Sequence, residues 1–184
     1  MKIGEEVAKA AGEALATVRA GAEKLVGRKL AGDAPRLTLT STWFEDGAPL
    51  PRRSSSEGDG VPPPLEWSEP PPETREFVLI VEDPDAPKPE PFVHWLVYDI
   101  NPGTRALDAE GAKHAREGQN SLLRDGFTPA APPRGHGVHH YHFQLFALDE
   151  PLALDKGEGK SRLVSHMEGH VIGFGELVGT YERR

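Results

Sequence analysis

The chain has 184 residues, with 21 basic and 29 acidic side chains that give a formal net charge of −8 at pH 7. The acidic excess argues against a general nucleic-acid-binding protein, and the length suits one ordinary domain with its own core. Since the chain contains no cysteine, disulfides, thiolate metal ligands and a cysteine nucleophile are excluded, and we expect a cytoplasmic protein. The sequence has no run of about 18 uncharged apolar residues, so we expect no stable insertion into a membrane.

The N-terminal segment carries the pattern of an amphipathic helix. Apolar residues recur at spacings of three and four between Glu5 and Arg28, with charged residues between them, which predicts one helix over this range. Gly12 and Gly21 each weaken such a helix by about 1 kcal/mol relative to alanine. We therefore expect a packing or dimerisation arm that needs the rest of the domain or a partner. The alternative, a membrane-surface helix, is disfavoured because the charges are mixed rather than basic.

The rest of the chain has the features of a β-rich domain. Glycine and proline together supply 38 residues, about a fifth of the chain, so we expect many turns and short strands. Strand-like composition or period-two alternation occurs at 37–40, 77–81, 92–100 and 139–148. Helical spacing returns only between Leu163 and Phe174. The fold class predicted is mostly β, an antiparallel β-sandwich with peripheral helices, divided into an N-terminal arm at 1–30 and a sandwich domain at 31–184.

A short acidic segment directly follows the second predicted strand. In Glu82-Asp83-Pro84-Asp85-Ala86-Pro87 two prolines restrict the backbone, so the carboxylates of Asp83 and Asp85 are aimed by stiff geometry. A pre-aimed carboxylate suits a binding site. The alternative is a strand-ending turn in which both side chains accept hydrogen bonds from nearby backbone N–H groups.

Two strands carry histidines at positions that can line a site. Alternation places His94 on the same face of its strand as Leu96 and Tyr98, where a structural core histidine is the alternative interpretation. In the last predicted strand, His139 and Tyr141 begin an otherwise apolar face. The preceding segment from Pro132 to Gly135 combines stiff prolines with a glycine whose backbone can approach a ligand closely. If these groups converge, the site is small and polar and suits a phosphate-type head group.

The histidine-rich segment also raises the question of a metal. Because side chains alternate along a strand, His139 points away from His140 and His142, and no cysteine completes a tetrahedral site. His166 and His170 have helical spacing but lack the glutamate that zincins require after the first histidine. We therefore expect no metal and no cofactor.

An enzymatic alternative uses the same residues differently. A hydrolase or esterase would take His94 or His139 as general base and Asp83 as the group that orients it. The sequence offers no Gly-x-Ser-x-Gly nucleophile elbow. Water would therefore have to serve as the nucleophile.

Five motifs resemble the phosphatidylethanolamine-binding protein family, in particular its bacterial Raf-kinase-inhibitor-like (YbhB/YbcL) branch. They are PPLEW at 63–67, DPDAP at 83–87, FVHW at 92–95 followed by YDI at 98–100, GVHHY at 137–141, and ELVGTY at 176–181. The motifs stand in family order from about Leu37 to Tyr181.

The resemblance implies a non-catalytic antiparallel sandwich with a small cavity for phosphate-like anions or phosphoethanolamine head groups. It also implies a cis peptide between Ala86 and Pro87. A kinase or protease as protein partner, and a homodimer to which the N-terminal helix would contribute, are further hypotheses. Carried over by position, the ligand-binding residues and the rim are Asp83, Asp85, His94, Pro132, Gly135, His139 and Tyr141.

Overall fold

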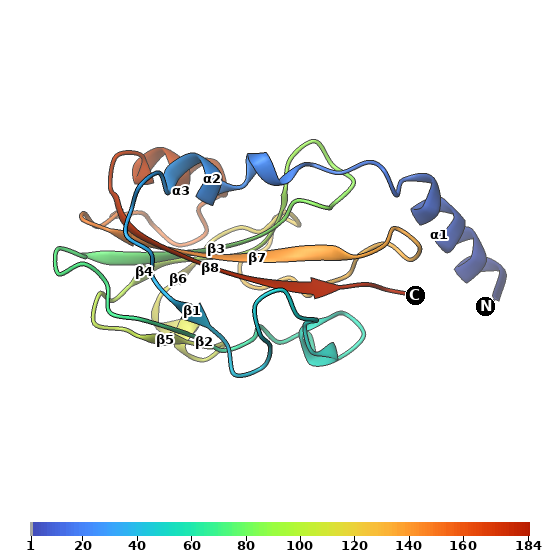
Figure 1. Cartoon of the computed structure of the whole chain (residues 1–184), viewed down its shortest axis with the longest axis horizontal. Helices are drawn as coiled ribbons and strands as arrows, with labels where there is room; N and C mark the ends of the chain where they lie inside the picture. Colours follow the sequence, from blue (N-terminus) through green and yellow to red (C-terminus); the bar gives the residue numbers. More distant parts are fainter. Residues whose placement is uncertain (1) are drawn as a thin grey trace.

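A computed structural model describes residues 2–184 (Figure 1). The helices are α1 (Lys2–Ala14), η1 (Ala22–Lys24), α2 (Val26–Leu30), η2 (Arg52–Ser54), η3 (Gly111–His114) and α3 (Lys160–Met167). The strands are β1 (Leu39–Thr40), β2 (Leu65–Trp67), β3 (Glu76–Asp83), β4 (Phe92–Ile100), β5 (Ala106–Leu107), β6 (Arg116–Glu117), β7 (His139–Leu148) and β8 (Val171–Tyr181).

Two antiparallel sheets form the centre of the molecule. The larger sheet has the strand order β6-β4-β3-β7-β8, and the smaller one has the order β1-β2-β5. The smaller sheet covers one face of the larger, while α2 and α3 lie on the opposite face (Figure 1). The mostly β fold class, with antiparallel sheets and peripheral helices, is therefore confirmed.

The large sheet is buried on both faces, which explains why β3 is an unbroken apolar run. Phe77, Leu79 and Val81 point into the core shared with the small sheet, whereas Val78 and Ile80 point into the core under the helices. A strand covered on both sides does not need polar residues at alternate positions. The predicted alternation of β7 is confirmed: Tyr141, Phe143, Leu145 and Ala147 share the first core, and Phe146 and Leu148 lie in the second.

The prediction of one helix from Glu5 to Arg28 was wrong. α1 ends at Ala14, and α2 begins only at Val26. Between them, the N–H of Ala20 donates to the carbonyl of Ala86 and the N–H of Gly21 donates to the carbonyl of Pro84. The backbone here pairs with a distant loop, and a helix would have consumed the same groups internally.

The C-terminal helix also ends earlier than its spacing predicted. α3 stops at Met167, and Val171 and Phe174 belong to β8. Gly169 has a φ of 80°, a left-handed conformation that glycine adopts without a steric penalty and that terminates helices. The apolar residues beyond it continue the second core from a strand rather than from a helix.

Candidate functional site

A cavity of about 310 Å³ opens where β3, β4 and β7 meet. Asp83 is the last residue of β3, Phe92 is the first of β4, and His139 is the first of β7. The loops after β3 and before β7 form the remaining walls. The lining residues are Asp83, Ala86, Pro87, Lys88, Phe92, His94, Leu122, Thr128, Pro129, Ala131, Pro132, Pro133, His139 and Tyr141.

Five of the seven predicted site residues line this cavity, namely Asp83, His94, Pro132, His139 and Tyr141. The other two lie behind the rim. Asp85 accepts hydrogen bonds from the backbone N–H and the ring of His140, each at 2.7 Å, and forms an ion pair with Arg19 at 2.7 Å. Gly135 packs against α1, where an added Cβ would lie 2.7 Å from the carbonyl oxygen of Lys9.

Asp85 is held ionised by its surroundings. Burial opposes its charge, but the hydrogen bonds from His140 and the positive charge of Arg19 outweigh burial and leave the pKa of Asp85 below its usual range. Its role in this structure is to join the loop after β3 to β7 and to the N-terminal segment.

A β-bulge determines where His94 points. Val81 pairs with Trp95 and Glu82 with Val93, so the register shifts by one residue at His94. The predicted face was therefore wrong: His94 does not project with Leu96 and Tyr98, which lie in the second core. Its ring instead lies against Tyr141.

One ring nitrogen of His94 forms a hydrogen bond with the backbone, and the other is available to a ligand in the cavity. Its Nδ1 lies 2.7 Å from the carbonyl oxygen of Thr128, and a carbonyl can only accept, so Nδ1 carries the proton. Its Nε2 makes no hydrogen bond within residues 2–184. Burial lowers the pKa of His94, and this effect exceeds the opposing influence of the Thr128 hydrogen bond and of the Asp83 charge.

Tyr141 supplies a second polar atom without a partner. Its side chain is 2% exposed, and its hydroxyl makes no hydrogen bond in the part of the chain that the structure describes. Burial, with the negative charges of Asp83 and Asp85, raises the pKa of Tyr141 well above its usual range. The hydroxyl therefore keeps its proton as an O–H donor, and Tyr141 is one of the residues that line the cavity.

His139 differs from both because its two ring nitrogens already have partners. Nδ1 lies 2.7 Å from Oδ2 of Asp83, and Nε2 lies 2.7 Å from Nδ1 of His136. In this arrangement His139 can neither donate to a ligand nor take a proton from water. It forms part of the cavity floor and orients Asp83.

The walls and the mouth complete the chemistry of the site. Proline, phenylalanine and leucine side chains make the walls largely apolar. At the mouth, the exposed amine of Lys88 lies 5.2 Å from the ring centroid of Phe92. Within residues 2–184, the cavity thus combines apolar walls, Nε2 of His94 and the Tyr141 hydroxyl without hydrogen-bond partners, and the cation of Lys88.

Sequence reasoning missed three residues that shape the site: His136, Lys88 and Thr128. Thr128 contributes its backbone carbonyl, and a pattern of side chains in the sequence does not reveal such a contact. The implied cis bond at Ala86–Pro87 was wrong, because no peptide bond within residues 2–184 is cis.

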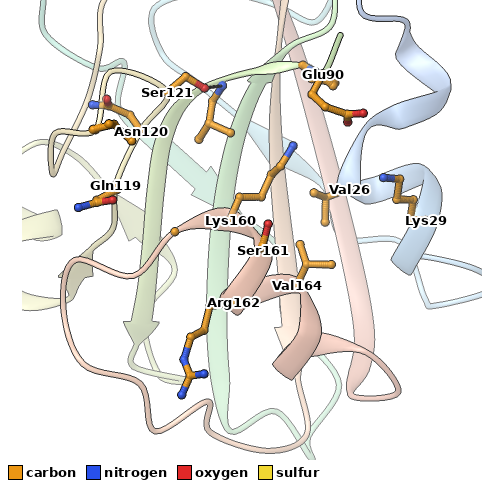
Figure 2. A pocket seen from close by; sticks show the side chains of 14 residues that line it. Val26, Lys29, Glu90, Gln119, Asn120, Ser121, Lys160, Ser161, Arg162 and Val164 are labelled. Atoms are coloured by element: carbon orange, nitrogen blue, oxygen red, sulfur yellow. Dashed lines mark hydrogen bonds between the residues drawn. The ribbon is translucent and has the colours of Figure 1, made fainter.

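A second cavity, of about 630 Å³, lies beside α3 (Figure 2). Its polar lining is mostly exposed, and the amine of Lys160 is already paired with the buried carboxylate of Glu82 at 2.9 Å. Figure 2 shows Lys160 and Arg162 pointing in opposite directions, so they do not converge on one point. None of the seven predicted site residues lines this cavity.

Among residues 2–184, no group of three or more histidine, cysteine or acidic side chains is arranged to hold a metal ion. Within the same residues, no helix combines the length and apolarity that a membrane crossing requires.

Comparison with known proteins agrees with the observed fold. The sequence profile of the family described as phosphatidylethanolamine-binding protein matches residues 40–182. The chain belongs to this family. The matched range contains every residue that lines the 310 Å³ cavity.

Individual relatives agree with this assignment. A UPF0098 protein of Chlamydia trachomatis is 41% identical over 152 residues, which cover 80% of this chain and 99% of the relative. A UPF0098 protein of Pyrococcus horikoshii is 38% identical over 163 residues, covering 84% and 82%.

Two solved structures show the same fold. A phosphatidylethanolamine-binding protein homologue from Chlamydia trachomatis superimposes with a TM-score of 0.75 at 38% identity, covering 82% of this chain and 100% of that one. YbcL of Escherichia coli, described as a new member of the mammalian family, gives a TM-score of 0.75 at 30% identity, with coverage of 80% and 99%.

Proposed function

We propose that this member of the family is a non-catalytic binding protein whose cavity takes a phosphate-type head group. The observation that supports this most directly is the buried hydroxyl of Tyr141, a residue that lines the cavity, because this hydroxyl has no hydrogen-bond partner among residues 2–184. An unpaired buried hydroxyl costs about 1 to 3 kcal/mol. A ligand oxygen that accepts a hydrogen bond from this hydroxyl removes that cost.

The adjacent ring of His94 suits the same ligand. A monoprotonated phosphate carries an O–H that can donate to the free Nε2 of neutral His94, while its other oxygens accept from Tyr141. When His94 is protonated, Nε2 becomes a charge-assisted donor instead. Hydrogen bonds to charged groups contribute about 1.5 to 3 kcal/mol each, which corresponds to millimolar to micromolar binding after desolvation.

Local charge does not oppose an anion. Oδ2 of Asp83 lies 2.7 Å from the ring of His139, and Oδ1 accepts a hydrogen bond from the N–H of Asp85 at 2.8 Å. Both carboxylate oxygens therefore already have partners within the protein. The amine of Lys88 at the mouth adds a long-range attraction for anions.

The hydrolase alternative finds less support. His139 has no ring nitrogen left for water. His94 is oriented by a carbonyl rather than by a carboxylate. A general base would therefore have to be His94 alone, with no nucleophile beside it.

Titration calorimetry tests the proposal. Inorganic phosphate and phosphoethanolamine should bind the full chain between about pH 5.5 and 8.5, and ethanolamine without phosphate should not. Absence of heat with both phosphate compounds would remove the proposed function. Turnover of generic phosphate esters that is lost in His94→Gln would favour the hydrolase instead.

A further inference from the structure

The segment between α1 and η1 crosses behind the cavity, and we call residues 15–21 the strap. Its backbone pairs with the loop after β3, through Ala20 N–H to Ala86 O at 3.1 Å and Gly21 N–H to Pro84 O at 3.0 Å. The guanidinium of Arg19 pairs with Asp85 at 2.7 Å. The strap therefore holds the loop that carries Asp83 at its start and Lys88 at the rim.

The strap also reaches the other side of the cavity through His136. The ring of His136 is 1% exposed, and its Nε2 lies 2.7 Å from the carbonyl oxygen of Leu15 and 3.2 Å from that of Val18. Because carbonyls only accept hydrogen bonds, Nε2 of His136 must carry a proton. The opposite nitrogen, Nδ1, faces His139.

The number of protons in this chain of contacts follows from its geometry. Nδ1 of His136 and Nε2 of His139 are 2.7 Å apart, so one proton must lie between them, since two lone pairs would repel at that distance. Oδ1 of Asp83 accepts the N–H of Asp85, and Oδ2 faces Nδ1 of His139 at 2.7 Å, which places a proton on Nδ1. The two rings together hold three protons, one more than two neutral imidazoles hold.

We propose that the strap fixes this proton arrangement and that His136 is a positioning residue for the cavity floor. The His136–His139 pair carries one positive charge that balances Asp83, so the floor is neutral toward a ligand. Leu15 supplies the carbonyl that keeps the tautomer of His136 in place. Ligand selection is then left to His94 and Tyr141.

Nitrogen-15 spectroscopy of the histidine rings in the full chain tests the proton arrangement directly. We expect Nδ1 of His139 and Nε2 of His136 to show the shifts of protonated nitrogens at neutral pH, and one further proton to lie on Nε2 of His139 or on Nδ1 of His136. A bare Nδ1 of His139, or no proton on either of the two facing nitrogens, would overturn the proposal. This measurement needs no substitution, so a folding defect cannot obscure it.

A variant tests the consequence for binding, which rests on the proposed function. His136→Gln removes the ring that shares the proton, so His139 should lose its second ring proton and leave the charge of Asp83 unbalanced. The Kd for inorganic phosphate should then rise about tenfold. Unchanged His139 shifts in this variant would also overturn the proposal.

The matched control is His166→Gln, since His166 is an exposed residue of α3 whose ring forms its hydrogen bonds with Ser165 and Arg162 of the same helix. It should change neither the shifts of His139 nor the Kd. If the wild-type chain shows the expected shifts but binds no phosphate, the proposed function fails while the role of the strap stands. If phosphate binds but the rings of His136 and His139 hold only two protons, the role of the strap fails while the proposed function stands.

Discussion

The rings of His94 and Tyr141 lie edge to face in one cavity, with centroids 5.0 Å apart and planes at 74°. The Tyr141 hydroxyl has no partner within residues 2–184, so binding and stability should respond differently to its removal. Tyr141→Phe should leave the free energy of unfolding unchanged or raise it by up to about 1 kcal/mol, because an unsatisfied buried group is deleted. The same change should weaken phosphate binding about tenfold. Urea unfolding and calorimetry on one preparation measure both effects.

Tyr98→Phe is the matched control for that prediction. The Tyr98 hydroxyl donates to the carbonyl of Asp155 and accepts the N–H of Glu158, so its removal should cost about 1 kcal/mol of stability. Tyr98 does not line the cavity, and phosphate affinity should stay the same. A loss of stability in Tyr141→Phe as large as in Tyr98→Phe would show that Tyr141 has a partner in solution.

The lowered pKa of His94 predicts how stability depends on pH. Burial makes the folded protein bind a proton at His94 less readily than the unfolded chain does. Between the ordinary histidine pKa of about 6.5 and the lowered one, the unfolded state therefore binds more protons, and the free energy of unfolding falls as pH falls. His94→Gln should lose this part of the pH dependence. Unfolding curves at several pH values compare the two slopes, and identical slopes would contradict the prediction.

Phosphate should reduce the same pH dependence, because an anion beside His94 favours its charged form. Phosphate affinity should accordingly rise as pH falls through the His94 transition. Calorimetry on the wild type and on His94→Gln checks this. An affinity that rises equally in both proteins would assign the effect to the titration of phosphate itself.

Much of the site could be predicted from local sequence because β-strands alternate with a fixed period. The face of β7 that carries His139 and Tyr141 followed directly from this alternation. The direction of His94 did not, since its bulge depends on the register between β3 and β4. The contacts of the strap could not be predicted either, because the carbonyl of Leu15 accepts a hydrogen bond from His136, which lies 121 residues away in the sequence. Spacing within a helix says nothing about contacts of that range.

A buried ion pair beside the second cavity gives a separate stability prediction. The carboxylate of Glu82 is fully buried and accepts hydrogen bonds from Val26 N–H, the Gln144 amide and the Lys160 amine, each at 2.9 Å. Lys160→Met removes the only cation among these donors and should cost about 3 kcal/mol of unfolding free energy. The double variant Glu82→Gln with Lys160→Met should recover most of that loss, since no buried charge remains. Urea unfolding of the single and double variants measures the coupling, and strictly additive losses would contradict it.

The strap should loosen when its ion pair is removed. Arg19 and Asp85 lie 2.7 Å apart with side chains 33% and 16% exposed, a setting in which an ion pair contributes about 1 kcal/mol. Arg19→Gln should therefore speed hydrogen exchange at the amides of Ala20 and Gly21 by about fivefold, while core amides of β3 keep their protection. Arg105→Gln breaks a pair of the same length and arginine exposure, to Glu69, and should leave both strap amides unaffected. Equal exchange at Ala20 in the wild type and in Arg19→Gln would mean that the backbone pairing to the loop after β3 holds the strap without Arg19.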